Sequence, residues 1–147
     1  MTMHRRPVGR ARMLAAIGAV AILVGCVLPW WTVGGAAGEI TRLTGNAFDS
    51  FGIVVFVAAL ATIALITLPY ARERPVPADR WSSYAVIAGI AWLAFLVRLA
   101  DLAVSRALQF DEPLDVVTRI PGLWLTAIGL VLLGRAAFDM WQAPSER

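Results

Sequence analysis

Four long apolar stretches, separated by short polar segments, dominate the pattern of hydrophobic and polar positions along the chain. The longest, Trp81 to Val104, carries its only charges, Arg98 and Asp101, towards one end. About 20 consecutive apolar residues are enough for a helix to cross a bilayer. We therefore predict an all-α fold, an integral membrane antiparallel four-helix transmembrane bundle that forms a single domain over residues 1–147. The predicted spans are 13–30, 51–70, 81–104 and 121–141, with outer loops at 31–50 and 105–120.

Helix-breaking residues mark the ends of these stretches. Pro29 and Pro69 are expected to close the first and second spans, because the residue before a proline avoids the helical conformation. Asp49 and Ser50 are suited to cap the second span, and Pro121 to open the fourth. The glycine-rich first outer loop has no long apolar run, and we leave open whether it contains a short hairpin. In the second outer loop, Leu114, Val117 and Ile120 share one helical face, which indicates a short helix lying in the membrane interface.

The distribution of arginine indicates the orientation in the membrane. All thirteen basic residues are arginine, and nine of them lie in the N-terminal tail, the turn 71–80 and the C-terminal end. Cytoplasmic segments of membrane proteins carry an excess of positive charge. We therefore expect both termini in the cytoplasm, and a multi-pass protein of a bacterial cytoplasmic membrane, the cell inner membrane.

Tryptophans fall near the ends of the predicted spans, and only Trp92 lies in the middle of one. Aromatic side chains of this kind gather at the headgroup level on both sides of a bilayer. Five of them are expected to act as interfacial anchors: Trp30, Trp31, Trp81, Trp124 and Trp141.

Two readings apply to the N-terminal region. A basic tail followed by an apolar run is typical of a signal peptide, but the run is long and three more spans follow, which favours a retained signal-anchor. Leu23-Val24-Gly25-Cys26 also matches the pattern before a lipidated cysteine of bacterial lipoproteins. Cleavage there would leave a mature chain that starts at Cys26 and has three spans. The apolar run continues beyond Cys26, so we favour four spans.

Composition supports a membrane protein and excludes several kinds of site. Apolar residues make up 59% of the chain and charged residues 16%, far from the roughly 45–50% and about 25% of soluble domains. The net charge of +3 resides in segments that flank the spans, so it indicates topology and no nucleic-acid partner. With one histidine, His4, and one cysteine, Cys26, we expect no metal site built on these residues and no cofactor. The bilayer is the first expected partner.

Two charged pairs lie within the predicted spans. Arg98 and Asp101 are three residues apart, so an ion pair between them is sterically allowed. Ionisable residues in spans are candidates for function, but Arg98 lies about 26 Å along the helix from Trp81, where arginine reaches the outer headgroups. Arg135 and Asp139 form a second pair, with Arg135 about 9 Å inside the level of Trp141. Here anchoring to the headgroups competes with burial against another helix or another protomer.

Small residues recur on one face of each span, which is how helices approach closely in lipid. The faces consist of Gly18, Ala21 and Gly25; Ala58 and Thr62; Ala85 and Gly89; and Gly122 and Thr126. They predict packing within the bundle or between protomers. Motifs of a phosphate loop, a serine hydrolase or a zinc protease are absent, and we expect no enzyme.

Three phrases carry a resemblance across the whole chain: Pro29-Trp30-Trp31, Thr44-Gly45-Asn46-Ala47-Phe48-Asp49 and Pro121-Gly122-Leu123-Trp124. With them the chain resembles small four-helix membrane proteins of high-GC bacteria that carry no assigned activity, and the resemblance implies topology alone. The loop order is also similar to that of claudin-type tetraspans, whose loop cysteines and Trp-Gly-Leu-Trp signature are missing. The first functional hypothesis is a non-catalytic assembly or accessory subunit that forms a homo-oligomer or joins a larger membrane complex. The alternative is an oligomeric channel or a transporter of ions or small solutes.

Overall fold

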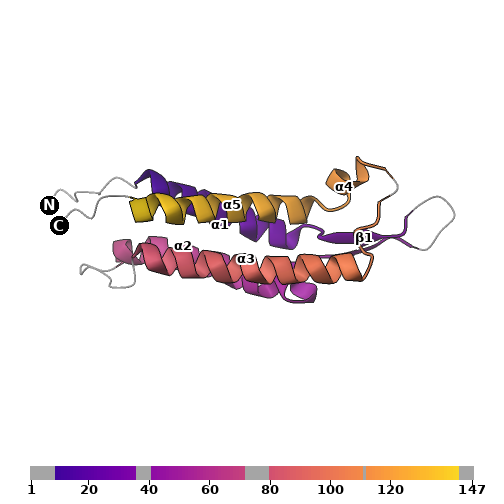
Figure 1. Ribbon diagram of the computed structural model, residues 1–147, viewed down its shortest axis with the longest axis horizontal. Coiled ribbons are helices and arrows are strands. Elements are labelled where there is room, and N and C mark those ends of the chain that lie inside the picture. The colour runs from indigo at the N-terminus through magenta and orange to yellow at the C-terminus, as the bar shows by residue number, and fades with distance from the viewer. Residues whose placement is uncertain (1–8, 36–40, 72–79, 111, 143–147) are drawn as a thin grey trace.

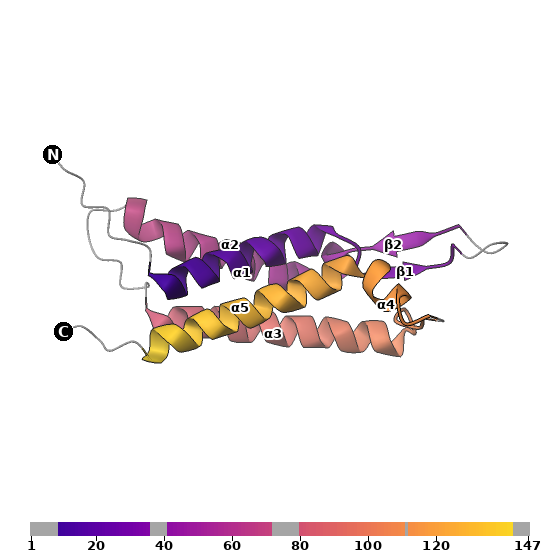
Figure 2. The same cartoon turned by 90° about the horizontal axis from the view of Figure 1, so that it is seen from above.

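Four long helices run along the long axis of the molecule in the computed structural model, which describes residues 9–35, 41–71, 80–110 and 112–142 (Figure 1). They are α1 (Arg10–Val27), α2 (Gly52–Ala71), α3 (Trp81–Val104) and α5 (Pro121–Gln142). Successive long helices are antiparallel, and α1 and α3 each contact both α2 and α5. The four therefore close into a ring, with the start of α1 and the end of α5 at the same end of the bundle (Figure 2).

The helices begin and end close to the predicted spans, with two informative differences at prolines. α1 ends at Val27, because Leu28, the residue before Pro29, is extended with ψ 160°. This is the conformation that a following proline favours. α2, in contrast, continues past Pro69 to Ala71, one residue beyond the predicted end of the span at Tyr70. A proline so close to the end of a helix removes only one of its last hydrogen bonds.

A small polar cap covers one end of the bundle. Strands β1 (Trp31–Val33) and β2 (Leu43–Gly45) pair antiparallel, with Thr32 opposite Thr44, and form the hairpin that the sequence left open. A 3-10 turn, η1 (Ala47–Asp49), then leads into α2. Asn46 caps this turn: its side chain accepts from the Phe48 N–H, and Asp49, which the sequence predicted as part of the cap of α2, accepts from the Asn46 N–H in return. The short helix expected in the second outer loop is present as the single turn α4 (Asp115–Thr118), and of its predicted apolar face Leu114 and Val117 are exposed while Ile120 is buried.

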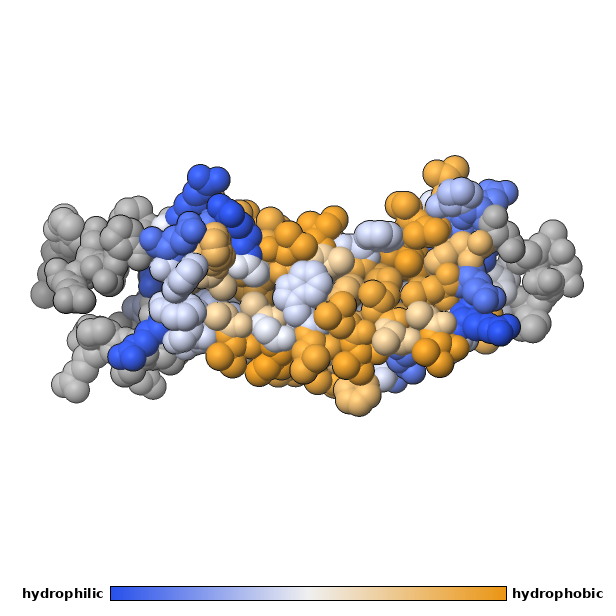
Figure 3. Space-filling model, in the orientation of Figure 1, coloured by the Kyte–Doolittle hydropathy of each residue, from blue (hydrophilic) through white to orange (hydrophobic). Residues whose placement is uncertain are grey.

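The bundle buries small side chains and exposes large apolar ones. Figure 3 shows hydrophobic residues over the middle of one face and hydrophilic residues gathered at its two ends. All four long helices are long and apolar enough to cross a membrane. A soluble protein that exposed so large an apolar surface to water would tend to aggregate. In lipid, it is the surface expected of a protein that spans the membrane. The chain is therefore a mostly helical, multi-pass membrane protein. Buried alanines dominate the interior: Ala15, Ala19, Ala58, Ala59, Ala88, Ala91, Ala94, Ala136 and Ala137.

The closest contact in the bundle is between α1 and α5, and glycines make it. A Cβ atom added to Gly18 would lie 2.8 Å from the carbonyl oxygen of Gly129, and one added to Gly129 would lie 2.7 Å from that of Gly18. Nearer the cap, in the same contact between α1 and α5, a Cβ on Gly122 would lie 2.5 Å from the carbonyl oxygen of Gly25. No larger residue fits at these positions without moving a helix. The faces of small residues predicted on the first and fourth spans thus pack against each other.

Candidate functional site

Arg98 is the charged residue that the structure buries most deeply in a spanning helix. It lies on the inward face of α3 between Phe95 and Leu102, and only 8% of its side chain is exposed. Its Nη1 pairs with Asp101, whose side chain is 55% exposed, and its Nε has no hydrogen-bond partner. The ion pair that the spacing of Arg98 and Asp101 allows is therefore formed. The guanidinium of Arg98 is desolvated there, whereas the carboxylate of Asp101 remains partly exposed.

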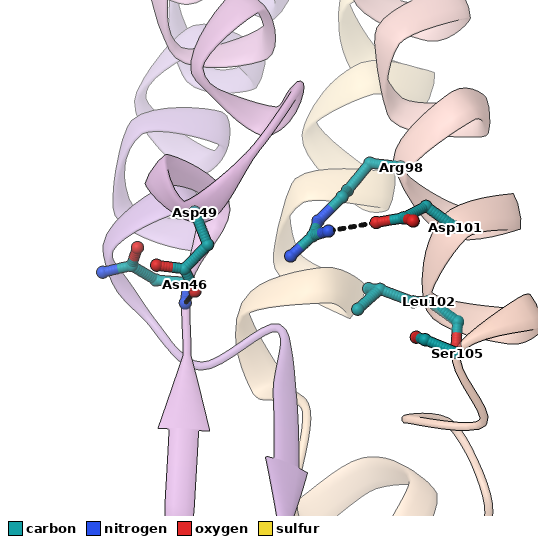
Figure 4. A network of polar contacts seen from close by, with 6 residues as sticks. All are labelled: Asn46, Asp49, Arg98, Asp101, Leu102 and Ser105. Atoms are coloured by element: carbon teal, nitrogen blue, oxygen red, sulfur yellow. Dashed lines mark hydrogen bonds and ion pairs between the residues drawn. The ribbon is translucent and has the colours of Figure 1, made fainter.

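The guanidinium of Arg98 is turned towards the cap. Figure 4 shows it extending from α3 towards the segment that carries Asn46 and Asp49, with Asp101 beside it. An arginine that anchors a helix in the headgroups would expose its charged end to them, so this placement does not support the anchoring interpretation. A charge held here is costly, because the protein replaces its hydration with one half-exposed carboxylate and leaves one N–H unpaired.

Arg135 and Asp139 lie at the opposite end of the bundle, on α5. Arg135 Nη2 is 3.0 Å from Asp139 Oδ1, and the guanidinium carbon is 5.7 Å from the centre of the Phe138 ring. The side chain of Arg135 is 61% exposed. It therefore lies along the outside of the bundle, where both headgroup anchoring and contact with another protomer stay open, and burial between helices of the same chain does not occur.

Trp30 is not the interfacial anchor that the sequence predicts. It is fully buried: its indole Nε1 donates to the Gly25 carbonyl at 2.9 Å, and its ring meets the Phe95 ring edge to face at 5.7 Å. The backbone N–H of Trp30 also donates to Gly45 of the hairpin. The hairpin thus folds this side chain down into the open end of the bundle, which it closes.

The other four predicted anchors keep more of their surface. Trp31 is half-buried against Gly45, and the side chains of Trp81, Trp124 and Trp141 are each about half exposed. Trp81 and Trp141 lie 6.5 Å apart at the end of the bundle where α1 begins. Trp124 lies at the cap end, where its indole donates to Val116 of α4 at 3.0 Å. These positions fit two aromatic levels at opposite ends of the spans.

Cys26, the candidate for lipidation, is fully buried inside the bundle. It lies one residue before the end of α1, next to the glycine contact with α5. Cleavage before Cys26 would remove Gly18 and Gly25, and with them the α1 side of the closest helix contact. The fold described here thus depends on the segment that lipidation would discard.

Between α2 and α3, in contrast to α1 and α5, the surface is hollowed. An apolar groove of about 500 Å³ opens there towards the outside of the bundle. Gly89, which the sequence placed on a packing face, is exposed on α3 with nothing within 4 Å of an added Cβ. Gly89 is therefore not used for packing within the chain, whereas Ala58 and Thr62, the small face predicted on α2, are buried. The groove is lined by Ala61, Ala64, Leu65, Leu68, Ser82, Ser83, Val86 and Ile87.

Within the part of the chain that the structure describes, no three histidine, cysteine or acidic side chains gather as metal ligands. Comparison of the chain with protein-family models, with curated proteins and with solved structures finds no match. Its role must therefore be inferred from three features of its own: the buried charge at the cap end, the glycine contact of α1 with α5, and the open groove between α2 and α3.

Proposed function

We propose that this chain is a non-catalytic structural subunit of a bacterial cytoplasmic membrane, which assembles with copies of itself or within a larger membrane complex. The observation that carries the proposal is the groove between α2 and α3. Its small side chains, among them Ala61, Ala64 and Ser83, would let the backbone of another helix approach closely. The corresponding small residues of α1 and α5 are already used inside the bundle.

The contrast between the two sides of the bundle supports association through one of them. α1 and α5 pass so closely at Gly18 and Gly129 that a Cβ atom added to either would lie less than 3.0 Å from the carbonyl oxygen of the other. The α2 and α3 side retains a groove whose volume lies within the range of about 300–1,000 Å³ that is common for ligand-sized cavities. Close packing and interhelical contacts, not the hydrophobic effect, drive association between helices in lipid. A surface with unfilled grooves is where such contacts remain to be gained.

The location follows from the arginines. Nine of thirteen belong to the N-terminal tail, the turn 71–80 and the C-terminal end, and the described residues at the edges of these segments, Arg10, Ala71, Trp81 and Gln142, lie at one end of the bundle (Figure 1). The excess of positive charge on cytoplasmic segments then favours both termini in the cytoplasm and the cap on the outer side.

A channel or carrier draws less support from the structure. The interior of one bundle is filled by side chains that are fully or almost fully buried, among them Ile22, Val55, Tyr84 and Leu130. The charged pairs at Arg98 and Arg135 lie near opposite ends. A conducting path would have to form between several copies, and ion flux into proteoliposomes above the level of empty vesicles would be its signature.

Native mass spectrometry of the full chain in mild detergent tests the assembly proposal. We expect oligomers or a co-purifying membrane protein, and Ala64→Leu in the groove should weaken the association at least about tenfold by overpacking. Ala100→Leu makes the same change at an exposed position of α3 outside the groove and should leave it unchanged. A strictly monomeric chain without partners, or equal effects of both variants, would overturn the proposal.

A further inference from the structure

A hollow at the cap end differs in character from the groove because charged and polar groups line it. It has a volume of about 210 Å³ and lies between the hairpin and α4. The Thr32 hydroxyl, on a buried side chain, donates to the Arg119 carbonyl at 2.8 Å and fastens the hairpin to the end of α4. The two walls are thus held together by a contact between residues 87 positions apart. The hollow is lined by Gly34, Gly35, Arg42, Asp115, Thr118 and Arg119.

Two guanidinium groups meet one carboxylate in this hollow. Arg119 Nε lies 3.2 Å from Asp115 Oδ2, an ion pair that leaves the two terminal nitrogens of Arg119 to other partners. Arg42, on the opposite wall, has no ion-pair partner among the residues that the structure describes. Among the residues that the structure describes, the charged side chains lining the hollow sum to +1, which matches the single negative charge of a phosphodiester. Arginine is well suited to such a group, because its planar fork donates to two phosphate oxygens at once.

The backbone of the hairpin adds to this polar surface. Gly34 and Gly35 have φ of 78° and 88°, so two successive residues adopt a conformation that larger side chains avoid. A Cβ on Gly35 would lie 3.2 Å from the Cβ of Arg42, which shows how closely the backbone passes the arginine.

The hollow also lies at the depth of the lipid headgroups. The Trp124 indole, half exposed on α5, donates to the Val116 carbonyl of α4 and so holds α4 at the level of the aromatic belt. On α4 and its N-terminal flank, Val117 and Leu114 are 60% and 73% exposed, as expected of a turn that dips apolar side chains into the membrane surface. Thr118 and Arg119, at the end of the same turn, line the hollow at this depth. Lipid phosphates are abundant at this level of the membrane.

We propose that this hollow binds a phosphate group, held by Arg42 and Arg119, while Thr118 lines the hollow and donates its hydroxyl to the Leu114 carbonyl at 3.1 Å. The group belongs either to a phospholipid headgroup of the outer leaflet or to a free phosphate, and the chemistry of recognition is the same for both. The inference needs the four-span fold but not the assembly proposed above.

The test uses the full chain in mild detergent, titrated separately with short-chain phosphatidylglycerol, inorganic phosphate and short-chain diacylglycerol, with binding followed by native mass spectrometry and calorimetry. Arg42→Gln and Arg119→Gln should each weaken phosphate-group binding at least about tenfold, because each removes charge-assisted hydrogen bonds. Arg42 has no ion pair with a described residue to lose, so its variant should fold normally. Asp115→Asn should strengthen binding several-fold, by raising the charge of the hollow to +2.

Arg106→Gln is the matched control, since Arg106 is an exposed arginine at the same end outside the hollow. It should change binding by less than twofold. Binding of phosphatidylglycerol but neither inorganic phosphate nor diacylglycerol assigns the site to a lipid headgroup, and binding of inorganic phosphate assigns it to the free anion. The proposal is overturned if diacylglycerol binds as well as phosphatidylglycerol, if neither phosphate compound binds, or if Arg106→Gln weakens binding as much as Arg42→Gln.

Discussion

The contact between α1 and α5 leads to a sharp prediction about Gly129. In Gly129→Ala the new methyl carbon would lie 2.7 Å from the Gly18 carbonyl oxygen and 2.9 Å from the Ile22 nitrogen, both backbone atoms. Backbone cannot rotate out of the way as a side chain can, so α1 and α5 must separate by a few tenths of an ångström. That movement loosens every contact along the two helices.

The magnitude follows from two opposing effects. Overpacking by one methyl group in a close-packed site costs about 1–3 kcal/mol. Alanine in place of glycine inside a helix gains up to about 1 kcal/mol. Gly89→Ala is the matched control, because Gly89 is also in a helix interior and has open space around its added Cβ. The helix gain is common to both variants and cancels, so Gly129→Ala should be less stable than Gly89→Ala by about 1–3 kcal/mol.

Equilibrium unfolding of the full chain in mixed detergent micelles, followed by helical circular dichroism, measures this difference. The double variant Gly18→Ala with Gly129→Ala should cost less than the sum of the two single changes, because one separation of α1 from α5 accommodates both methyl groups. If Gly129→Ala were as stable as Gly89→Ala, the close contact of these helices would be refuted.

Three further changes probe the cap end, all followed in the same unfolding assay. Trp30→Phe should lower the free energy of unfolding by about 1–3 kcal/mol, because it removes the hydrogen bond to Gly25 and part of a buried ring; an unchanged value would mean that Trp30 does not close the bundle. Asp101→Asn should destabilise the chain by about 1–3 kcal/mol, since it leaves the buried Arg98 without its partner. Arg98→Met, which removes that charge but keeps the side-chain volume, should be neutral or stabilising, and a larger loss from Arg98→Met than from Asp101→Asn would contradict the buried position of the guanidinium.

The helices could be predicted because lipid imposes a length requirement that the chain meets four times. The contacts between them could not. The small residues at Gly18, Gly25 and Gly122 indicated close packing, but not which helix each would meet, and Gly129 was missed altogether. Spacing along one helix shows which residues share a face, while the partner of that face depends on the packing of all four.

The misplacement of Trp30 has a similar origin. Two adjacent tryptophans after a proline indicate the membrane interface by composition, but neighbouring residues of an extended segment point to opposite sides. The hairpin places Trp30 inwards and Trp31 half outwards, and that hairpin has only three residues in each strand. Its glycine-rich sequence has no alternation of apolar and polar residues from which the hairpin could have been predicted.

For Arg98 the helical rise gives depth along the membrane normal, but not the direction in which the side chain points. A reader of the sequence could place it near the outer headgroups, and the structure turns it inwards towards the cap. The polar hollow between Arg42 and Arg119 was missed for a related reason. It is formed by two loops that are distant in the chain and joined by Thr32, and no local pattern connects them.

The central claim is that four helices cross the membrane and that the cap lies outside. Labelling of single introduced cysteines in whole cells tests this claim most directly. In a Cys26→Ala background, Leu43→Cys in the hairpin should react with a membrane-impermeant maleimide added outside. Gly9→Cys before α1 and Gln142→Cys at the end of α5 should react only after the membrane is opened. Reaction of Leu43→Cys and Gly9→Cys from the same side of an intact membrane would contradict it.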